Sequence, residues 1–479
     1  MLPGTLERVE LLRGSNSVVW GSQAMAGVLA LTTREVDGAE LAGEYGAYDT
    51  AYLTGTAGIA RDGHAVSLSA GYARTDGFSA TTAGPEKDGY RQWQLSGKAR
   101  AELAEGLTLR ANGRYADSRL ELDLTAPDSP LDVQDSREWS ARGGLDHQGG
   151  NLHLSAGFAL SSIRRAYDGV WGPSFFSASG RRADLSGALD LPAGLRLDFG
   201  ADSEWTRARS TFDPRAKART TSGHALLGRY GDGWSASVGL RVDDHSRFGT
   251  HALLGANGTV RLVDQLRLRA SYGEGFKAPT LYQLFGGFVG NSALKPERSR
   301  SYDAGLEWGH RAAPLHFAAT VFRRDSRNLI DLDSSYVYAN TALARAWGLE
   351  LEGGARPTER FAVRAAYTFT RARDRSAGRD LARRPRHGLN ASADWTTPLH
   401  DLALGADLRL AGDAVEYDWL GNATRIDGYA TLGLRASLPL GDHLELFGRV
   451  ENVGDARYET AAGFATAGRS AYLGARARF

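Results

Sequence analysis

The chain ends in Ser470-Ala-Tyr-Leu-Gly-Ala-Arg-Ala-Arg-Phe479, where apolar residues alternate with polar, charged or glycine residues. The apolar members of this stretch are Ala471, Leu473, Ala475, Ala477 and Phe479. Successive side chains of a β-strand point to opposite faces. The stretch therefore predicts a strand with one apolar face and one polar, charged face.

The same alternation recurs from about residue 39 onward, for example in residues 195–202, 234–241, 266–272 and 430–438. Tight turns, such as Pro192–Gly194 and Gly231–Gly233, alternate with longer connections, such as residues 75–89 and 118–136. Short turns at one end and long loops at the other are typical of outer-membrane barrels. We therefore predict an all-β fold, a closed transmembrane antiparallel β-barrel of about 22 strands.

Composition excludes several other classes of protein. The formal net charge is +1, from 57 basic and 56 acidic residues, so no bulk field attracts nucleic acid. Cysteine is absent, and no run of 18 apolar residues predicts a membrane-spanning helix. A soluble β-sandwich or propeller would also alternate, but it explains the two classes of connection poorly, and no blade-length repeat is present.

The first 34 residues break the pattern and carry a distinct motif. They contain Leu6-Glu-Arg-Val-Glu-Leu-Leu-Arg-Gly14, Val19-Trp-Gly-Ser22 and Ala26-Gly-Val-Leu-Ala-Leu-Thr-Thr-Arg34. This region resembles the closing third of the plug domain of TonB-dependent outer-membrane receptors, with Ser15 and Ala30 where that family usually has proline and asparagine. The residues that match the plug motif are Arg8, Glu10, Arg13, Gly14, Trp20, Gly21, Gly27 and Arg34.

Two later regions resemble the same family. Residues 272–284 with 291–297 are similar to its barrel signature, and residues 449–459 with 468–479 are similar to its final hairpin. The resemblance implies that Tyr472 and Phe479 belong to the signal read by the barrel assembly machinery. It also implies two parts: residues 1–36 as the C-terminal part of a plug, and residues 37–479 as the barrel that encloses it.

The resemblance implies active uptake of a scarce metal chelate across the bacterial outer membrane by a monomer in contact with membrane lipid. The complete protein would be driven by TonB with ExbB and ExbD. Residues 463–472 are nearest to cobalamin receptors, although ferric-siderophore and haem receptors share this ending. Haem is less favoured, because no histidine occurs from Phe276 to Leu294. The histidines are scattered and no G-x-S-x-G elbow occurs, so we predict no enzyme activity.

The start of the sequence has no charged-then-apolar export signal and no complete plug. We therefore expect that the native product begins upstream and that Met1 is an internal start within the plug. A truncated barrel fragment unable to couple to TonB is the alternative.

Two sets of side chains are candidates for binding. Aromatic residues in long loops predict ligand contacts, with a membrane-interface girdle as the alternative: Trp171, Phe175, Phe176, Tyr282, Phe285 and Phe288. Spaced carboxylates in one loop suggest calcium, which cobalamin receptors use in early loops, although no EF-hand spacing occurs and plain solvation is favoured: Asp117, Asp123, Asp128, Asp132 and Asp135. No other cofactor is expected.

Charged residues of the plug motif must find partners inside the barrel. In Trp347-Gly-Leu-Glu-Leu-Glu-Gly353 the two leucines share one face, so Glu350 and Glu352 share the other. If the leucines face lipid, both glutamates face the lumen. We predict that Arg8 or Arg13 pairs with Glu350 or Glu352, with lumen water or other barrel arginines as the alternative partners.

Overall fold

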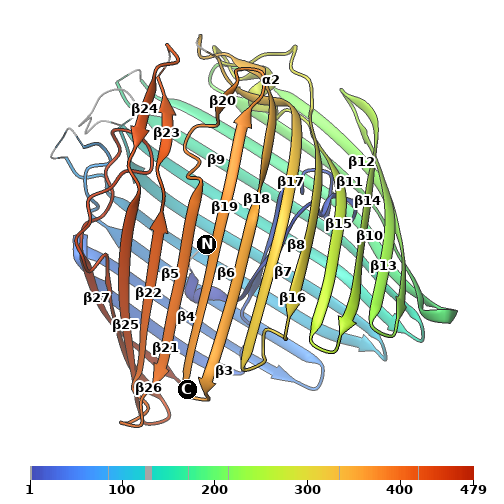
Figure 1. Cartoon of the computed structure of the whole chain (residues 1–479). Helices are drawn as coiled ribbons and strands as arrows, with labels where there is room; N and C mark the ends of the chain where they lie inside the picture. The colour runs from blue at the N-terminus through green and yellow to red at the C-terminus, as the bar shows by residue number, and fades with distance from the viewer. Residues whose placement is uncertain are drawn as a thin grey trace.

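In the computed structural model, the chain forms a closed antiparallel β-barrel with a short N-terminal segment inside it (Figure 1). The structure describes residues 3–82, 84, 86–123, 132–170, 172–213, 215–333, 335–418 and 420–479. Within these residues the wall has 22 strands when the two-residue β20 is counted with β21, since both pair with β19. The predicted fold class and strand number are confirmed.

The wall strands follow one another in chain order, and the last strand, β27, pairs with the first, β3. Their bounds are β3 (Gly38–Gly46), β4 (Thr50–Arg61), β5 (His64–Thr75), β6 (Tyr90–Ala104), β7 (Leu107–Glu121), β8 (Val133–Gly149), β9 (Leu152–Asp168), β10 (Ser174–Leu191), β11 (Leu195–Ser210), β12 (Ala216–Gly231), β13 (Trp234–His245), β14 (Gly249–Val263), β15 (Leu266–Lys277), β16 (Glu297–Trp308), β17 (Leu315–Leu332), β18 (Tyr338–Thr358), β19 (Phe361–Asp374), β20 (Arg379–Asp380), β21 (His387–Thr396), β22 (Ala403–Ala411), β25 (Tyr429–Leu440), β26 (Leu444–Glu451) and β27 (Ser470–Arg478).

Long connections gather at one end of the barrel (Figure 1). They carry helix α2 (Leu281–Phe285) and the separate hairpin of β23 (Ala414–Tyr417) and β24 (Ala423–Ile426). Short 3-10 turns, η2 (Ala47–Asp49) and η3 (Pro192–Gly194), join neighbouring strands. Among the described residues, no helix has the length and apolar character needed to cross a membrane.

The two faces of the wall differ as the alternation predicts. In β13 the outward side chains Val238 and Leu240 are exposed, whereas the inward side chains Arg241 and Asp243 are buried. The outward side chains are apolar because they meet lipid, and the inward ones can be polar because they meet partners within the barrel. The apolar surface of this protein therefore lies on the outside of the wall.

Residues 3–36, here called the luminal segment, lie inside the barrel. They comprise η1 (Pro3–Thr5), β1 (Leu6–Arg13), α1 (Ser17–Trp20) and β2 (Gly27–Thr33), and β1 pairs with β2 in a sheet of its own. η1 packs on β4 and β5, and α1 packs on β12 to β15. Contacts with such distant parts of the wall require the segment to cross the lumen.

The predicted bounds of the connections need correction. The loop predicted at residues 118–136 is shorter, because β7 continues to Glu121 and β8 begins at Val133. The sequence also predicts a tight turn at Pro357–Thr358, but β18 continues through both residues and the turn lies between Thr358 and the start of β19 at Phe361. Strand pairing continues beyond the part of the wall that meets lipid, and there the side chains no longer alternate between apolar and polar.

Candidate ligand-binding site and the luminal segment

Arg13, the last residue of β1, anchors the luminal segment to β18. Its Nη1 lies 2.9 Å from Glu350 Oε2 and also pairs with Glu352. Burial acts to lower the pKa of Arg13, but Glu352 and Glu350 outweigh it and raise that pKa. Arg311 supplies a second cation to Glu352 at 3.1 Å. Of the four predicted combinations, the structure contains the two made by Arg13.

Arg8 makes neither predicted pair, because its Nε lies 3.2 Å from Glu10 Oε2 within β1 itself. The segment has a second attachment near its exit into β3. Arg34 forms a two-point contact with Glu40, one bond of which measures 3.1 Å. Glu35 accepts from Arg100 at 2.9 Å, and this hydrogen bond lowers the pKa of Glu35. The segment is thus held by charge pairs near both ends of its hairpin.

Between these attachments, the segment lies against glycines of the wall. A Cβ at Gly255 of β14 would lie 2.8 Å from Val18, and one at Gly273 of β15 would lie 2.5 Å from Ser15. Such distances are too short for ordinary side-chain contacts, so only glycine permits this approach. Gly14 and Gly21 have φ values of 78° and 106°, which suit glycine at the two turns flanking α1.

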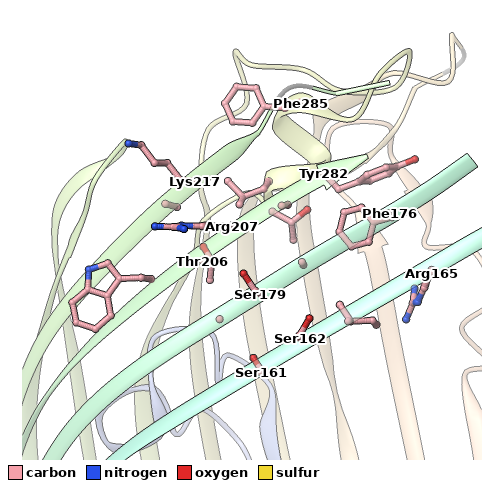
Figure 2. Close-up of a pocket in the computed structure, with 18 of the residues that line it drawn as sticks. Ser161, Ser162, Arg165, Phe176, Ser179, Thr206, Arg207, Lys217, Tyr282 and Phe285 are labelled. Carbon is pink, nitrogen blue, oxygen red and sulfur yellow. The ribbon is translucent and has the colours of Figure 1, made fainter. Parts of the chain in front are cut away.

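A cavity lies at the loop end. The residues around it come from both faces of the wall over β8 to β12. The register of the paired strands shows which of these side chains face the lumen and which face outward. Phe176 faces the lumen and meets Tyr282 of α2 edge-on, with ring centroids 5.9 Å apart (Figure 2). A capping box between Thr280 and Gln283 fixes the start of α2. It thereby places Tyr282 and Phe285, three residues apart, at the cavity.

Polar groups accompany these rings in the lining. Arg165 and Arg247 contribute guanidinium groups, and Arg247 also lies 5.3 Å from the ring of Phe285. Burial raises the pKa of the Tyr282 hydroxyl, so that it remains a neutral hydrogen-bonding group at neutral pH. Gln23 of the luminal segment lines the same cavity. A ligand there would meet both the wall and the luminal segment.

The structure divides the six aromatic candidates. Phe176, Tyr282 and Phe285 line the cavity. Phe175 is not among the lining residues, and alternation turns it to the outer face, where Arg164 and Arg209 lie 5.9 and 5.8 Å from its ring centroid. Phe288 is 87% exposed, pairs with Phe212 and is not part of the lining. Trp171 lies outside the described residues.

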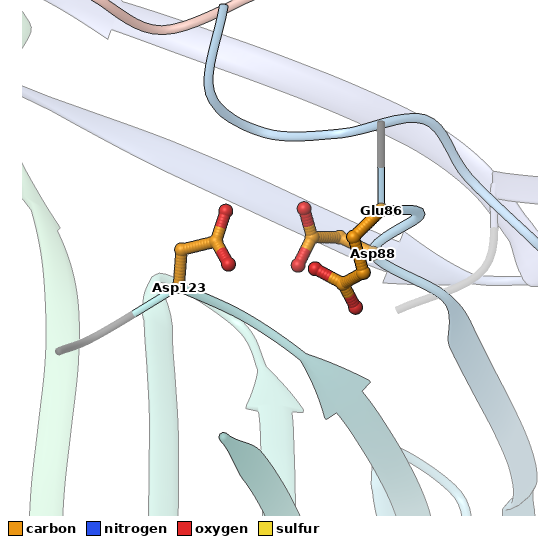
Figure 3. A group of neighbouring side chains, drawn as sticks. All are labelled: Glu86, Asp88 and Asp123. Carbon is orange, nitrogen blue, oxygen red and sulfur yellow. The ribbon is translucent and has the colours of Figure 1, made fainter. Parts of the chain in front are cut away.

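The aspartates suggested as a calcium site do not share one place. Asp117 pairs with Arg137 at 2.9 Å and Asp135 with Arg119 at 3.3 Å, since both stand on strands rather than in the loop. Asp132 is buried, and Asp128 lies outside the described residues. Asp123 instead meets two carboxylates of the preceding loop, Glu86 and Asp88 (Figure 3). The hypothesis of a single-loop site is wrong in that form.

The two residues of the predicted assembly signal lie where the barrel closes. Phe479 exchanges backbone hydrogen bonds with Ala39 at 2.8 and 3.0 Å, and its side chain is exposed. Tyr472 faces inward, with Arg449 placed 3.9 Å over its ring. Both residues therefore join the end of the chain to the rest of the wall. Their reading by the assembly machinery stays a prediction.

A barrel of this size, with an apolar outer face, a segment across its lumen and a cavity at its loop end, defines an outer-membrane receptor. Residues 30–453 match the family described as TonB dependent receptor-like, beta-barrel, and the chain belongs to that family, whose members are transporters of the bacterial outer membrane.

Known structures support the fold. A mutant ferric enterobactin receptor from Pseudomonas aeruginosa is 18% identical, with a TM-score of 0.83 over 99% of this chain and 85% of that one. The FrpB iron transporter from Neisseria meningitidis is 13% identical, with a TM-score of 0.86 over 100% of this chain and 88% of that one. At these identities the likeness is one of fold.

Sequence reasoning missed several residues of the site. Gln23 has no distinguishing neighbours in the sequence, and Arg165 is one arginine among many. The close-approach glycines Gly255 and Gly273 belong to a chain with 59 glycines, so their number hides them. Only the pairing of strands shows which of these residues face the same space.

Proposed function

We propose that this protein is an outer-membrane receptor for active uptake of a ferric chelate of the siderophore class. The observation that carries the proposal is the cavity shared by α2 of the loop end and Gln23 of the luminal segment. A ligand bound there would touch both a barrel loop and the part of the chain that obstructs the lumen. Binding can therefore alter how the luminal segment is held, which an active transporter requires.

Two observations favour a ferric chelate over cobalamin. The structural neighbours reported above are named as a ferric enterobactin receptor and an iron transporter. The lining combines the rings of Phe176, Tyr282 and Phe285 with the guanidinium groups of Arg165 and Arg247. Rings stack on aromatic chelating groups, and guanidinium groups bind anionic oxygen. Cobalamin remains the second candidate because of the closing stretch at residues 463–472.

Direct binding distinguishes the two ligands. The full chain, refolded in detergent, is titrated with ferric enterobactin and separately with cyanocobalamin, and the quenching of tryptophan fluorescence is followed. We expect saturable binding of the ferric chelate at micromolar concentration or below. Saturable binding of cyanocobalamin alone would overturn the iron proposal and restore the cobalamin interpretation.

Uptake is tested separately from binding. In the complete protein, we propose that TonB with ExbB and ExbD drives the release of ligand into the periplasm and that residues 1–36 are part of the plug. Cells that produce the complete protein should accumulate ⁵⁵Fe-enterobactin only while the proton-motive force is intact. Binding without accumulation would assign the chain to the alternative of a barrel that cannot couple to TonB.

A further inference from the structure

Six basic side chains gather on the outer face of the wall, near the loop end of β9 to β12. Strand pairing places them in three successive rows, each two residues farther along the strands. In the first row, Arg181 stands opposite Trp205, which stands opposite Arg219. In the second row, Arg207 stands opposite Lys217. In the third row, Ser177 stands between Arg164 of β9 and Arg209 of β11. We call Arg164, Arg181, Arg207, Arg209, Lys217 and Arg219 the outer basic patch.

Alternation fixes the face on which the patch lies. Trp205, Arg207 and Arg209 share parity with Leu197 and Phe199 of β11, which are in register with the apolar outward residues of β12 and β13. All six basic side chains are exposed. Figure 2 shows Arg207 and Lys217 extending away from Phe176 and Tyr282, which face the lumen. The patch is therefore directed toward the membrane and not toward the transported ligand.

The patch lacks the acidic partners found elsewhere on the outer face. Across the described residues, none of its six cations has a carboxylate within 4.0 Å. On β17 and β18, by contrast, Arg323 and Arg345 share Asp325 at 2.8 and 2.6 Å. The outward carboxylates of the flanking strands are engaged elsewhere: Asp117 and Asp135 are paired with arginines of β8 and β7, and Asp244 of β13, opposite Thr221, accepts a hydrogen bond from Thr250 at 3.1 Å. Within β9 to β12 themselves, the outward acid among the described residues is Asp168, which lies farther along β9.

The patch also lies at a definite depth in the membrane. Trp205 belongs to the row farthest from the loop end. Trp139 of β8 is level with the next row, because it stands opposite Ser162, which stands opposite Ser179. Tryptophans of this kind mark the boundary between hydrocarbon and headgroups. At about 3.3 Å per residue, the three rows span roughly 13 Å along the strands from that boundary. The cations thus lie at the level of lipid headgroups.

We propose that the outer basic patch binds a phosphate-bearing lipid headgroup of the outer leaflet. Four adjacent strands separated by about 4.8 Å give the patch a width of roughly 15 Å, enough for a phosphorylated disaccharide. Guanidinium groups present forked donors that match phosphate oxygens. Six cations without carboxylate partners at headgroup depth repel one another unless an anion lies among them. A phosphorylated glycolipid supplies that anion at the required depth.

The test compares lipid retention by matched variants of the full chain. In the patch variant, Arg181, Arg207, Lys217 and Arg219 are each replaced by Gln. The control carries Arg323→Gln and Arg345→Gln, which remove outward cations that already have a carboxylate partner. Each protein is mixed with lipid A in detergent and washed on a column, and the bound lipid is quantified by mass spectrometry. We expect retention to fall about fivefold for each cation removed from the patch, and the control to match the parent.

Equal retention by the parent and the patch variant would overturn the proposal, provided both show the heat-resistant migration of a folded barrel. If the patch variant fails to fold, the corresponding Arg→Lys variant with Lys217 intact replaces it. That variant keeps the charge, and it should retain lipid A but not dephosphorylated lipid A. Equal retention of the dephosphorylated lipid would show that phosphate is not recognised. Inorganic phosphate that binds as tightly as lipid A would make the patch a simple anion site and overturn the lipid assignment.

Discussion

The barrel wall and the luminal segment are held by different kinds of interaction. β10 pairs with β11 at 16 consecutive positions, and the wall strands, with β20 counted with β21, form a closed ring of paired neighbours. β1 and β2 pair only with each other among the described residues, and the luminal segment meets the wall through ion pairs, scattered hydrogen bonds and close contacts with glycine. Backbone hydrogen bonds in a membrane have no water to replace them, whereas ion pairs in a wet lumen do. This difference permits the wall to stay closed when the segment moves.

The largest expected effect comes from filling the space that the segment occupies beside the wall. The double variant Gly255→Val and Gly273→Val places side chains where Val18 and Ser15 now lie. Overpacking of this kind costs roughly 1–3 kcal/mol per site. We expect the luminal segment to be displaced while the barrel remains closed. Because the protein has no cysteine, Ser17→Cys, at a position now 2% exposed, reports displacement through a large rise in maleimide labelling.

Gly143→Val is the matched control for this substitution. Gly143 lies on the outer face of β8, and a Cβ there would meet nothing within 4 Å. It should change neither the labelling nor the heat resistance of the barrel. Loss of heat resistance in the double variant, with labelling unchanged, would contradict the idea that the wall and the segment are independent.

A second prediction separates the two faces of one wall strand. Phe176→Ala removes a ring from the cavity, and Phe175→Ala removes its neighbour on the outer face. A buried aromatic contact typically contributes about 2 kcal/mol or more to binding. We therefore expect Phe176→Ala to weaken binding of the ferric chelate at least about tenfold, and Phe175→Ala to leave it unchanged. Fluorescence titration measures both, and equal losses would contradict the assignment of faces.

How much of this could be predicted from the sequence depends on the range of the interaction. Alternation is a local property, so strands, faces and the inward direction of Glu350 and Glu352 follow from neighbouring residues. The pairing with Arg13 joins residues 337 apart, yet it could be predicted because a charge in a lumen needs a partner. Gln23 could not be assigned to the cavity, since its place depends on how α1 lies against the wall. Phe175 was misplaced because the start of β10 could not be located.

The third prediction weakens the ion pairs without changing shape. Glu350→Gln with Glu352→Gln removes both carboxylate partners of Arg13. Arg13 is 44% exposed, so solvent screens the attraction and the loss is about 1 kcal/mol or less. We expect labelling of Ser17→Cys to rise severalfold, and the parent to reach the same rate in high salt. Arg8→Gln should have no effect, because the ion pair of Arg8 is with Glu10 of the same strand and not with the wall. A rise for Arg8→Gln equal to that of the double variant would contradict the specific role of Arg13.

The smallest effect concerns pH at the other attachment of the luminal segment. The hydrogen bond from Arg100 lowers the pKa of Glu35 below its ordinary 4.5. A carboxyl group with a lowered pKa in the folded state contributes its full stabilisation above 4.5 and loses it as the pH falls through the lowered value. Attachment of the segment should therefore weaken between about pH 5 and pH 3, and not at higher pH.

Protection of the Val28–Thr33 amides from hydrogen exchange, corrected for the intrinsic rate at each pH, measures this loss. The Arg34–Glu40 pair also holds this end of the segment, so the informative quantity is the difference between the parent and Glu35→Gln. That difference should be largest at neutral pH and vanish at the acid end, whereas a constant difference across the range would show that the Glu35 carboxylate does not hold the segment.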